Sequence, residues 1–531
     1  MNIRLRSAGH RMTALLFAIF AILLQQPARA ADPQNVRPPG VAGSFYPADP
    51  KALSAMIDDL LAHASPPKIN DPILAVVAPH AGYQFSGPVA AYTYAALKGR
   101  KFSRVVVIAP SHFEAFAFTS VYDGDAYVTP LGTVPVDKVF ARQLVKMSPT
   151  IRLSTQGHLP TAEGTEHALE VELPWLQRVL GDFQLVPVVM GDQSYENSRA
   201  LGVALAKLIA GGDTLIVASS DLSHYHPYDE AVKIDHKTLN ALQAWDYFSM
   251  SQNFQERIWE ACGGAPIVAA MIAAERMGAN QALLLKYANS GDITGDRSRV
   301  VGYSAVVLVR TPSKRTAGEP FSIGGHEKNE LLALARKSVE YAVREKKAYE
   351  PPASASEALN QERGAFVTLK ESGELRGCVG YMAAMSPLYM AVRDTATLAA
   401  LRDSRFLPVA ASELGQLEYE ISVLSPLRRV QDVRQIKVGQ HGLLMRNGVY
   451  QGVLLPQVPV EERWDRQKFL EETCAKAGMP TDCWKDENTD IFEFTAVVFG
   501  ETRPQPLTPE TVSPPGLPAR QGVPAPGSPP H

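Results

Sequence analysis

The sequence predicts a layered α/β domain with a largely parallel central sheet, followed by a smaller α+β domain. Within residues 36–310, short apolar runs rich in β-branched residues alternate with segments of helical periodicity, an order typical of layered α/β folds. Several of these runs stop at polar residues, as buried parallel strands commonly do. Beyond residue 326 the order of predicted elements becomes mixed and includes a hairpin, which indicates an α+β fold.

The composition is that of a globular protein with more than one domain. The 531 residues exceed the usual size of a single core, so we expect two or three domains. The net charge of -3 provides no overall attraction for nucleic acid or for an anionic membrane. Neither is therefore a predicted partner.

The first 30 residues have the pattern of a secretory signal peptide. Basic residues precede an apolar run over residues 12–24, and the segment ends in Ala28-Arg29-Ala30. A basic start, a short apolar segment and an Ala-x-Ala ending predict cleavage after Ala30. Because the apolar run is shorter than the ~20 residues that span a bilayer, we expect a periplasmic or secreted protein with no stable membrane insertion after cleavage.

The first domain, residues 36–310, begins with an extended segment rich in Pro and Gly, followed by a predicted helix over residues 51–62. Apolar runs predict strands at residues 73–78, 105–110, 185–190, 214–219, 283–288 and 301–309. Helical periodicity occurs between several of them, at residues 89–97, 136–146, 167–180, 198–209 and 266–277. Such an order predicts a central sheet with helices on its faces.

A linker separates the two predicted domains. Residues 311–326 are rich in Pro, Gly, Ser and Thr, which is typical of linkers. The second domain, residues 327–502, has predicted helices at 327–346, 388–401 and 466–477, predicted strands at 364–369, 417–424 and 491–499, and a hairpin turn at Asn447-Gly448. The Pro-rich tail at residues 503–531 has too little apolar content to fold.

The strand ends of the first domain carry side chains suited to chemistry. His80 and His112 each follow a predicted strand, and Asp221 and His224 follow a third. Because ligands of open α/β sheets gather beyond the carboxyl ends of parallel strands, we expect these side chains at one rim. Each also has a structural interpretation, since a histidine at a strand end is often only hydrogen-bonded and Asp221 can cap the next helix.

Cys262 adds a sulfur ligand to this set. It lies at a predicted helix start, where backbone N–H groups favour a thiolate. Imidazole and thiolate ligands suit copper, iron and zinc. We therefore predict a metal site of His80, His112 and Cys262, with Asp221 and His224 as acid/base or orienting groups. The alternative is a buried cysteine that serves only as a small hydrophobe.

Arg376 and Cys378 are the candidate catalytic residues of the second domain. They occur in Leu-Arg-Gly-Cys-Val-Gly over residues 375–380, where glycines allow another backbone to approach and the guanidinium can bind a carboxylate or phosphate. The alternative is a tight strand exit with a buried cysteine. Cys474 and Cys483 are close in sequence and are the pair most easily bridged in an oxidising compartment.

A series of motifs occurs in order along the first domain. They are Arg-Pro-Pro from residue 37, Ala-Gly-Ser-Phe-Tyr-Pro from 42, Ala-Pro-His-Ala-Gly-Tyr from 78, Pro-Ser-His from 110, Glu-His-Ala-Leu-Glu from 166, Ser-Asp-Leu-Ser-His from 220 and Cys-Gly from 262. In these motifs the domain resembles the Memo family, also known as AmmeMemoRadiSam system protein B.

This resemblance implies the fold of the class III extradiol dioxygenases, non-heme iron enzymes that open catechol rings. It also implies a metal pocket of His80, His112 and Cys262, with Asp221 and His224 beside it. Those dioxygenases use two histidines and a carboxylate for Fe(II), whereas Cys262 stands at the place of the carboxylate here. A thiolate shifts the preference toward copper, so the resemblance implies redox chemistry of copper or iron rather than ring opening.

The second domain has its own ordered motifs. They are Leu-Arg-Gly-Cys-Val-Gly from residue 375, Asp-Ser-Arg-Phe from 403, Glu-Ile-Ser-Val-Leu-Ser from 420 and Gly-Val-Leu-Leu-Pro-Gln from 452. In these motifs it resembles the AMMECR-type domain, AmmeMemoRadiSam system protein A, which implies a compact α+β fold and a catalytic or binding role near Cys378. The resemblance also implies a functional link to a radical SAM protein. Because no radical SAM cysteine triplet occurs in this sequence, that partner would be a separate protein.

These observations predict an exported fusion protein that binds copper or iron. We expect a metal-dependent oxidoreductase acting on a small molecule, a peptide or a protein modification. Two alternatives remain open. A zinc-dependent hydrolase would activate water at the same ligands, with Asp221 or His224 handling protons. A non-catalytic peptide-binding module would need no metal.

Overall fold

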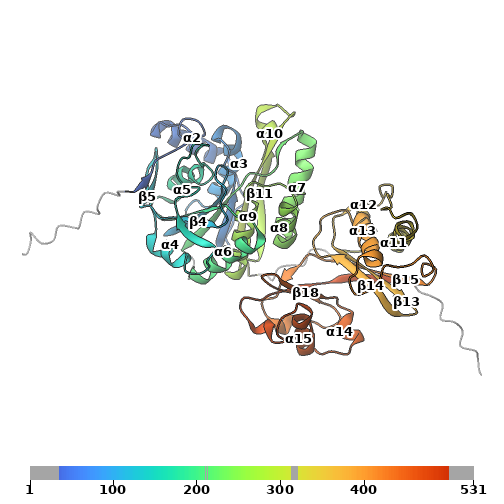
Figure 1. The fold of residues 1–531 in the computed structure, drawn as a ribbon. Coiled ribbons are helices and arrows are strands. Elements are labelled where there is room, and N and C mark those ends of the chain that lie inside the picture. Colours follow the sequence, from blue (N-terminus) through green and yellow to red (C-terminus); the bar gives the residue numbers. More distant parts are fainter. Residues whose placement is uncertain (1–34, 210, 212, 313–320, 502–531) are drawn as a thin grey trace, which may run out of the picture.

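The computed structural model describes residues 35–209, 211, 213–312 and 321–501 (Figure 1). The predicted signal peptide at residues 1–30, the predicted tail at 503–531 and residues 313–320 of the predicted linker lie outside these residues. In the part of the chain that is described, no helix combines the length and apolar character needed to cross a membrane. In Figure 1 the first domain runs from blue to yellow and the second from orange to red.

A nine-stranded mixed sheet forms the centre of the first domain. Its four inner strands run parallel, in the order β2 (Ile73–Ala78), β9 (Thr214–Ser219), β3 (Arg104–Pro110) and β8 (Gln184–Met190). On one side, β12 (Val300–Val309) pairs antiparallel with β2, β11 (Gln281–Asn289) and β10 (His224–His226). On the other side, β4 (Thr119–Tyr122) pairs antiparallel with β8 and parallel with β7 (Ile151–Ser154).

The prediction of a largely parallel sheet is correct for the inner strands and wrong for both edges. Only the short helix α10 (Ser290–Thr294) and a turn join β11 to β12, and such a short connection permits antiparallel pairing alone. The apolar pattern of these strands does not reveal their direction, because both faces of β12 are buried and such a strand looks the same in either orientation.

Helices cover both faces of the sheet and form two cores. The first core includes residues of α2 (Pro50–His63), α3 (Tyr83–Ala95) and α5 (Leu173–Leu180). The second includes residues of α4 (Lys138–Leu144), α6 (Tyr195–Leu208), α7 (Tyr228–Ala244), α8 (Tyr247–Gln255) and α9 (Gly264–Arg276). Successive residues of β3 enter opposite cores, Val105 and Val107 the first and Val106 and Ile108 the second. The helices α7 and α8 have no counterpart among the predicted elements.

Smaller elements complete this domain. A three-stranded sheet consists of β1 (Val36–Arg37), β5 (Ala126–Thr129) and β6 (Gly132–Pro135). The helix predicted over residues 167–180 begins later than expected, as the short turn η1 (Glu170–Glu172) followed by α5. Residues 166–168 therefore belong to the loop that precedes the helix and can face the end of the sheet.

The second domain contains two antiparallel sheets of four strands. The first has the order β14 (Glu374–Tyr381), β13 (Ala365–Glu371), β15 (Leu417–Leu424) and β20 (Ala496–Gly500). Residues of α11 (Gly325–Glu345), α12 (Glu357–Asn360) and α13 (Leu388–Leu401) share a core with this sheet. The second has the order β16 (Arg428–Arg429), β19 (Asp490–Phe494), β17 (Gly442–Asn447) and β18 (Tyr450–Leu454), with α15 (Arg466–Lys476) packed on β17 and β18. The short elements η2 (Val433–Gln435), α14 (Val458–Glu461) and η3 (Cys483–Lys485) lie in its connections.

The single strand predicted at residues 491–499 is wrong. The chain leaves one sheet after Phe494 and enters the other at Ala496, so this segment forms both β19 and β20. A continuous apolar run does not reveal a change of sheet, because both strands are partly buried along their length. The α+β prediction is correct in its outline, and the hairpin turned at Asn447-Gly448 is confirmed as β17 and β18.

The two domains meet around Asp490, whose side chain is buried. Its carboxylate accepts hydrogen bonds from Arg199 of α6 and, at 2.6 Å, from Nη2 of Arg276 of α9. Nε of Arg429 lies 3.7 Å from the same carboxylate. Phe492 packs beside Phe248 of α8 with ring centroids 6.1 Å apart, which continues the second core of the first domain into the second domain.

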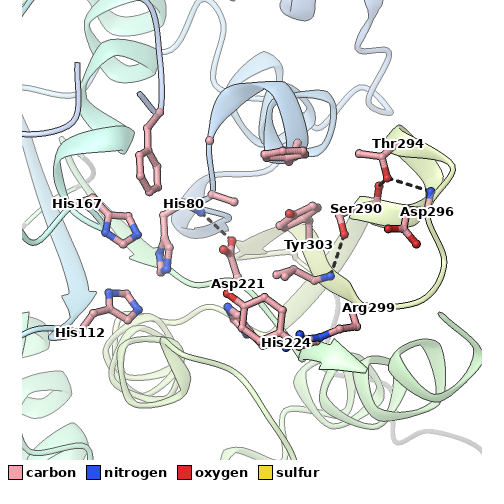
Figure 2. Close-up of a pocket in the computed structure, with 16 residues that line it drawn as sticks. His80, His112, His167, Asp221, His224, Ser290, Thr294, Asp296, Arg299 and Tyr303 are labelled. Atoms are coloured by element: carbon pink, nitrogen blue, oxygen red, sulfur yellow. Dashed lines mark hydrogen bonds between the residues drawn. The ribbon is translucent and has the colours of Figure 1, made fainter. Parts of the chain in front are cut away.

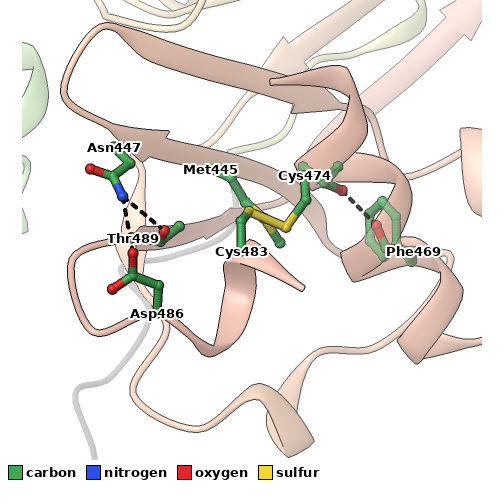
Figure 3. Close-up of a disulfide and its surroundings, with 8 residues drawn as sticks. Met445, Asn447, Phe469, Cys474, Cys483, Asp486 and Thr489 are labelled. Atoms are coloured by element: carbon green, nitrogen blue, oxygen red, sulfur yellow. Dashed lines mark hydrogen bonds between the residues drawn. A yellow bond between two sulfur atoms is a disulfide. The ribbon is translucent and has the colours of Figure 1, made fainter. Parts of the chain in front are cut away.

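A disulfide joins Cys474 of α15 to Cys483 of η3 (Figure 3). Both cysteines are buried, and Met445 of β17 contacts both sulfur atoms. The pair that the sequence favours for a bridge is therefore the pair that the structure joins. Cys262 and Cys378 are free thiols.

Candidate metal centre

His80 lies directly beyond β2 with its side chain almost fully buried. Its Nδ1 is 2.8 Å from Oγ of Ser219, the last residue of the neighbouring strand β9. The Ser219 hydroxyl donates to the Ala168 carbonyl at 2.6 Å, so its oxygen is available to accept from the His80 Nδ1–H. This arrangement leaves His80 Nε2 as the atom that can bind a metal.

His112, beyond β3, is held by Glu166 through two contacts. Its backbone N–H donates to Oε2 of Glu166 at 2.6 Å, and its Nδ1 lies 3.0 Å from Oε1. Burial opposes the charged imidazole, but the hydrogen bond and the charge of Glu166 raise the pKa of His112. A carboxylate on Nδ1 orients the ring and leaves Nε2 free for a metal.

Cys262 reaches the two histidines from the turn before α9. Its Sγ lies 3.1 Å from Nε2 of His80 and accepts a hydrogen bond from the backbone of Asp221 at 3.3 Å. A Cβ atom at Gly263 would lie 2.2 Å from the Ser219 carbonyl oxygen, so only glycine lets this turn approach β9 so closely. The candidate ligand atoms of His80, His112 and Cys262 all lie within 4.8 Å of one another, which fits one metal ion.

Burial outweighs the effect of the helix start at Cys262 in the metal-free protein, because the backbone N–H groups of Asp221 and Gly263 lower the pKa of the thiol but the loss of solvation raises it more. Burial, with a smaller effect from Asp221, raises the pKa of the Cys262 thiol. The protonated thiol can then donate to Nε2 of His80. A metal ion at this place would have to displace that proton, which makes metal binding dependent on pH.

Asp221 and His224 line the same cavity as the histidines. Oδ1 of Asp221 accepts a hydrogen bond from the backbone of His80 at 2.9 Å, yet burial raises the pKa of Asp221 to about 7. Nδ1 of His224 lies 2.8 Å from the Leu222 carbonyl, and burial lowers the pKa of His224. The structure thus brings all five residues predicted for this domain to one site.

Glu166 and His167 also belong to the site, although neither was among the residues predicted for it. The His167 ring stacks on His112 with centroids 5.1 Å apart and lies edge-on to His80 at 5.6 Å. Burial lowers the pKa of His167 to about 4. His112, Glu166 and His167 form a second, overlapping group of candidate ligands. The adjacent Glu-His pair in a loop before a helix was the available signal.

Comparison with known families agrees with this geometry. A family model described as Memo-like protein matches residues 37–307, and one described as AMMECR1 matches residues 332–499. The chain belongs to the Memo family. The matched ranges show that it joins a Memo domain to an AMMECR1 domain, as the sequence motifs predicted.

Known Memo proteins match the first domain over almost their whole length. A MEMO1 family protein of Methanopyrus kandleri is 40% identical over 285 residues, which cover 52% of this chain and 99% of that protein. One from Methanothermobacter thermautotrophicus is 38% identical over 278 residues, which cover 51% of this chain and 99% of that protein.

A solved structure also matches part of the chain. The crystal structure of an uncharacterized protein of Pyrococcus horikoshii is 41% identical to this chain, covers 34% of this chain and 93% of that chain, and has a TM-score of 0.33.

A cavity of about 600 Å³ opens beside the histidines of the Memo domain (Figure 2). Figure 2 shows His80, His112 and His167 on one side and Arg299 and Asp296 on the other, with Asp221, His224 and Tyr303 between them. A second cavity of about 570 Å³ is lined by Cys262, and His224 lines both cavities. The volume of the first cavity is within the usual range of small-molecule sites.

The two candidate residues of the AMMECR1 domain lie on β14 and line neither of these cavities. The guanidinium of Arg376 is already bound by Glu413, with Nε 2.7 Å from Oε1, so it is not free to bind a substrate carboxylate. Cys378 accepts a hydrogen bond from the Thr368 hydroxyl at 3.3 Å, and burial raises its pKa. The expected close approach is present at Gly377, where a Cβ would lie 2.3 Å from the Ala399 carbonyl of α13.

Proposed function

We propose that the Memo domain binds a redox metal, copper or iron, through His80, His112 and Cys262. The observation that carries this proposal is the convergence of one ring nitrogen from each of two histidines and one sulfur within 4.8 Å, from three separate segments. In both histidines the other ring nitrogen has a partner, Ser219 or Glu166, which orients the ring toward the shared point. Imidazole and thiolate ligands together suit copper and iron.

The reaction we propose is an oxidation or reduction of a small molecule, a peptide or a protein side chain in the cavity of about 600 Å³. A bound copper or iron ion would supply electron exchange at this point. Asp221, with its pKa near 7, is suited to accept or donate a proton at neutral pH. His224 and His167, which burial keeps neutral at that pH, are suited to hydrogen-bond a ligand without adding charge.

We also propose that the Memo domain shares the fold of the class III extradiol dioxygenases. The mixed sheet with helices on both faces and a site beyond its parallel strands supports this likeness. Cys262 in place of a carboxylate argues for a reaction other than ring opening.

A zinc-dependent hydrolase is the second candidate, and the position of Asp221 favours it. A metal-bound water needs a neighbouring group that takes up a proton, and Asp221 lines the same cavity as His80 and His112. A module that binds a peptide without turnover would use the same cavity and would leave metal unnecessary.

For the whole chain, we propose export and a second site in the AMMECR1 domain. The disulfide between Cys474 and Cys483 supports an oxidising compartment, periplasmic or extracellular. Cys378 on β14 remains the candidate residue for the second site, whereas the pairing of Arg376 with Glu413 favours a structural role for that arginine. The functional link to a separate radical SAM protein stays a proposal from the family resemblance.

Metal analysis of the full-length chain tests the proposal. Plasma mass spectrometry should find copper or iron close to one ion per chain, and His80→Ala and Cys262→Ala should each lose it. His63→Ala is the matched control, because His63 is exposed on α2, outside both cavities. Zinc in place of copper or iron would favour the hydrolase. No metal after loading under reducing conditions would refute the metalloenzyme and favour the binding module.

A further inference from the structure

We propose that the cavity of the Memo domain selects a substrate with a flat apolar body and an anionic group, a carboxylate or a phosphate, which Arg299 binds. This inference rests on the proposed function, since it places the reacting end of the substrate at His80 and His112. The imidazoles of His80 and His112 and the guanidinium of Arg299 lie at opposite sides of the cavity (Figure 2), which separates the two ends of such a substrate.

The walls of the cavity favour a flat apolar body. Phe45, Phe85, Tyr225, Tyr303 and Val301 line it. Aromatic walls stabilise a planar or apolar ligand through contact area and ring stacking. The imidazoles of His80, His167 and His224 also line the cavity and add further flat surfaces.

The Tyr303 hydroxyl is a polar group in these walls. Tyr303 is only 2% exposed, lines the cavity and makes no hydrogen bond from its hydroxyl to any other residue in the described part of the chain. Because Tyr303 lines the cavity, its hydroxyl can donate a hydrogen bond to a ligand there or accept one from it. The cavity thus offers a hydrogen-bonding position between the imidazoles of His80 and His112 and the guanidinium of Arg299 (Figure 2).

Arg299 is the only arginine or lysine that lines this cavity. It is exposed and forms no ion pair with any described residue, and its guanidinium lies 5.0 Å from the centre of the Tyr225 ring. A guanidinium stacked on an aromatic ring keeps its N–H groups available for a carboxylate or phosphate. The carboxylate of Asp296 also lines the cavity, but it is bound by the backbone N–H and the hydroxyl of Ser298, at 2.9 Å and 2.7 Å.

Titration of the full-length chain with three probes tests this assignment. The probes are benzoate, phenyl phosphate and the neutral benzyl alcohol, followed by ligand-observed NMR in both the metal-free and the metal-loaded protein. Arg299→Gln should weaken the binding of one or both anions about fivefold and leave benzyl alcohol unchanged. Asp296→Asn, the matched control of opposite charge, should strengthen anion binding. Tyr303→Phe should weaken all three probes several-fold.

The outcomes separate this inference from the proposed function. A loss for benzoate alone identifies a carboxylate ligand, and a loss for phenyl phosphate alone identifies a phosphate. Equal affinity of the anions in wild type and Arg299→Gln, or no saturable binding of either anion, overturns the inference even if metal binds. An Arg299 effect that persists in a protein that cannot be loaded with metal supports the anion site and refutes the metalloenzyme.

Discussion

The hydrogen bonds behind His112 show how single residues shape the site. Glu166 accepts hydrogen bonds from both the backbone and the ring of His112. Because Glu166 is buried, these bonds help to offset the loss of solvation of its carboxylate. The burial of the carboxylate opposes its charge, yet His112 and nearby backbone N–H groups lower the pKa of Glu166. The carboxylate therefore stays ionised and can strengthen His112 as a ligand.

Replacing Glu166 with Gln should weaken metal binding. The amide keeps one hydrogen bond to His112 but loses the negative charge, so we expect a 10- to 100-fold loss of affinity, roughly what such partners contribute. Competition with a chromophoric chelator measures the affinity. Glu163→Gln, an exposed residue of the same loop, is the control and should change nothing. Equal affinity in all three proteins would show that Glu166 has only a structural role.

Glu172 should make stability depend on pH. It is buried, and although the Tyr94 hydroxyl donates a hydrogen bond to it and Oγ of Ser219 lies 2.7 Å from its Oε1, burial raises its pKa from 4.5 to about 8. The folded protein therefore keeps a proton that the unfolded chain has lost, and the free energy of unfolding falls as the pH rises from about 4.5 to 8.

Glu172→Gln should remove this part of the pH dependence. From pH 5 to pH 8, the free energy of unfolding of the variant should rise by a few kcal/mol relative to that of the wild type, because Gln has no proton to lose. Urea denaturation of both proteins at the two pH values gives the difference. Parallel losses of stability in wild type and variant would contradict the prediction.

At the scale of residues, the sequence predicted the site residues that follow strands and missed those that lie elsewhere. His80, His112, Asp221 and His224 follow strands, so the expected edge of a parallel sheet brought them together. Cys262 was predicted because a thiolate is a suitable metal ligand. Glu166 and His167 precede a helix instead, and only the folded chain shows that their loop lies against the ends of β2 and β3.

Among the elements, the close contact of α6 and α9 depends on one missing side chain. A Cβ at Gly202 of α6 would lie 2.7 Å from the Ala269 carbonyl and 2.8 Å from Cβ of Ile272, both on α9. The backbones of α6 and α9 therefore approach each other closely at Gly202. Because α9 begins two residues after Cys262, this contact also sets the position of the sulfur.

Gly202→Ala should destabilise the Memo domain by about 1–3 kcal/mol, the usual cost of overpacking, even though alanine favours helices. Thermal and urea unfolding measure the change. Gly325→Ala at the start of α11 is the control, because no atom lies within 4 Å of its added Cβ, and it should be neutral or slightly stabilising. A stable Gly202→Ala protein would mean that the two helices can move apart without cost.

The elements most accurately predicted are those with long, uniform patterns. The strand β2, the strand β15 and the helix α13 have the predicted bounds, because each is buried in a regular way. The short strand β4, the helix α8 and the change of sheet after Phe494 depend on contacts with distant segments. No local pattern distinguishes them.

For the whole molecule, the junction at Asp490 decides whether the two domains act as one body. The carboxylate, 2% exposed, offsets the charges of Arg199 and Arg276, with Arg429 close by. A buried carboxylate in contact with arginines from both sides of an interface stabilises it only while every charge keeps its partner.

Asp490→Asn should therefore uncouple the domains. The loss of the charge leaves the arginines without compensation, which costs on the order of 3–5 kcal/mol. Calorimetry should show the two domains unfolding in separate transitions, and the midpoint temperature of the less stable domain should be lower than in the wild type. Glu487→Gln is the control, since its ion pair with Lys207 is exposed and should contribute little. A single unshifted transition in Asp490→Asn would contradict a role for this junction.

The sequence predicted the fusion, the order of its domains and the place of the linker, because motifs and composition change clearly there. It did not predict the junction. Asp490, Arg199 and Arg276 occur in ordinary polar positions of their elements, and only the packing of the two domains makes them partners.

The segment that forms β19 and β20 also determines when the second domain can be completed during synthesis. β19 lies between β16 and β17 in one sheet and carries Asp490, while β20 closes the other sheet beside β15. Both leave the ribosome after every other strand of the domain. The Memo domain, whose last strand ends at Val309, can thus fold while the rest is still being translated. The AMMECR1 domain must wait for its final strands, and it then closes both sheets and docks on a neighbour that is already folded.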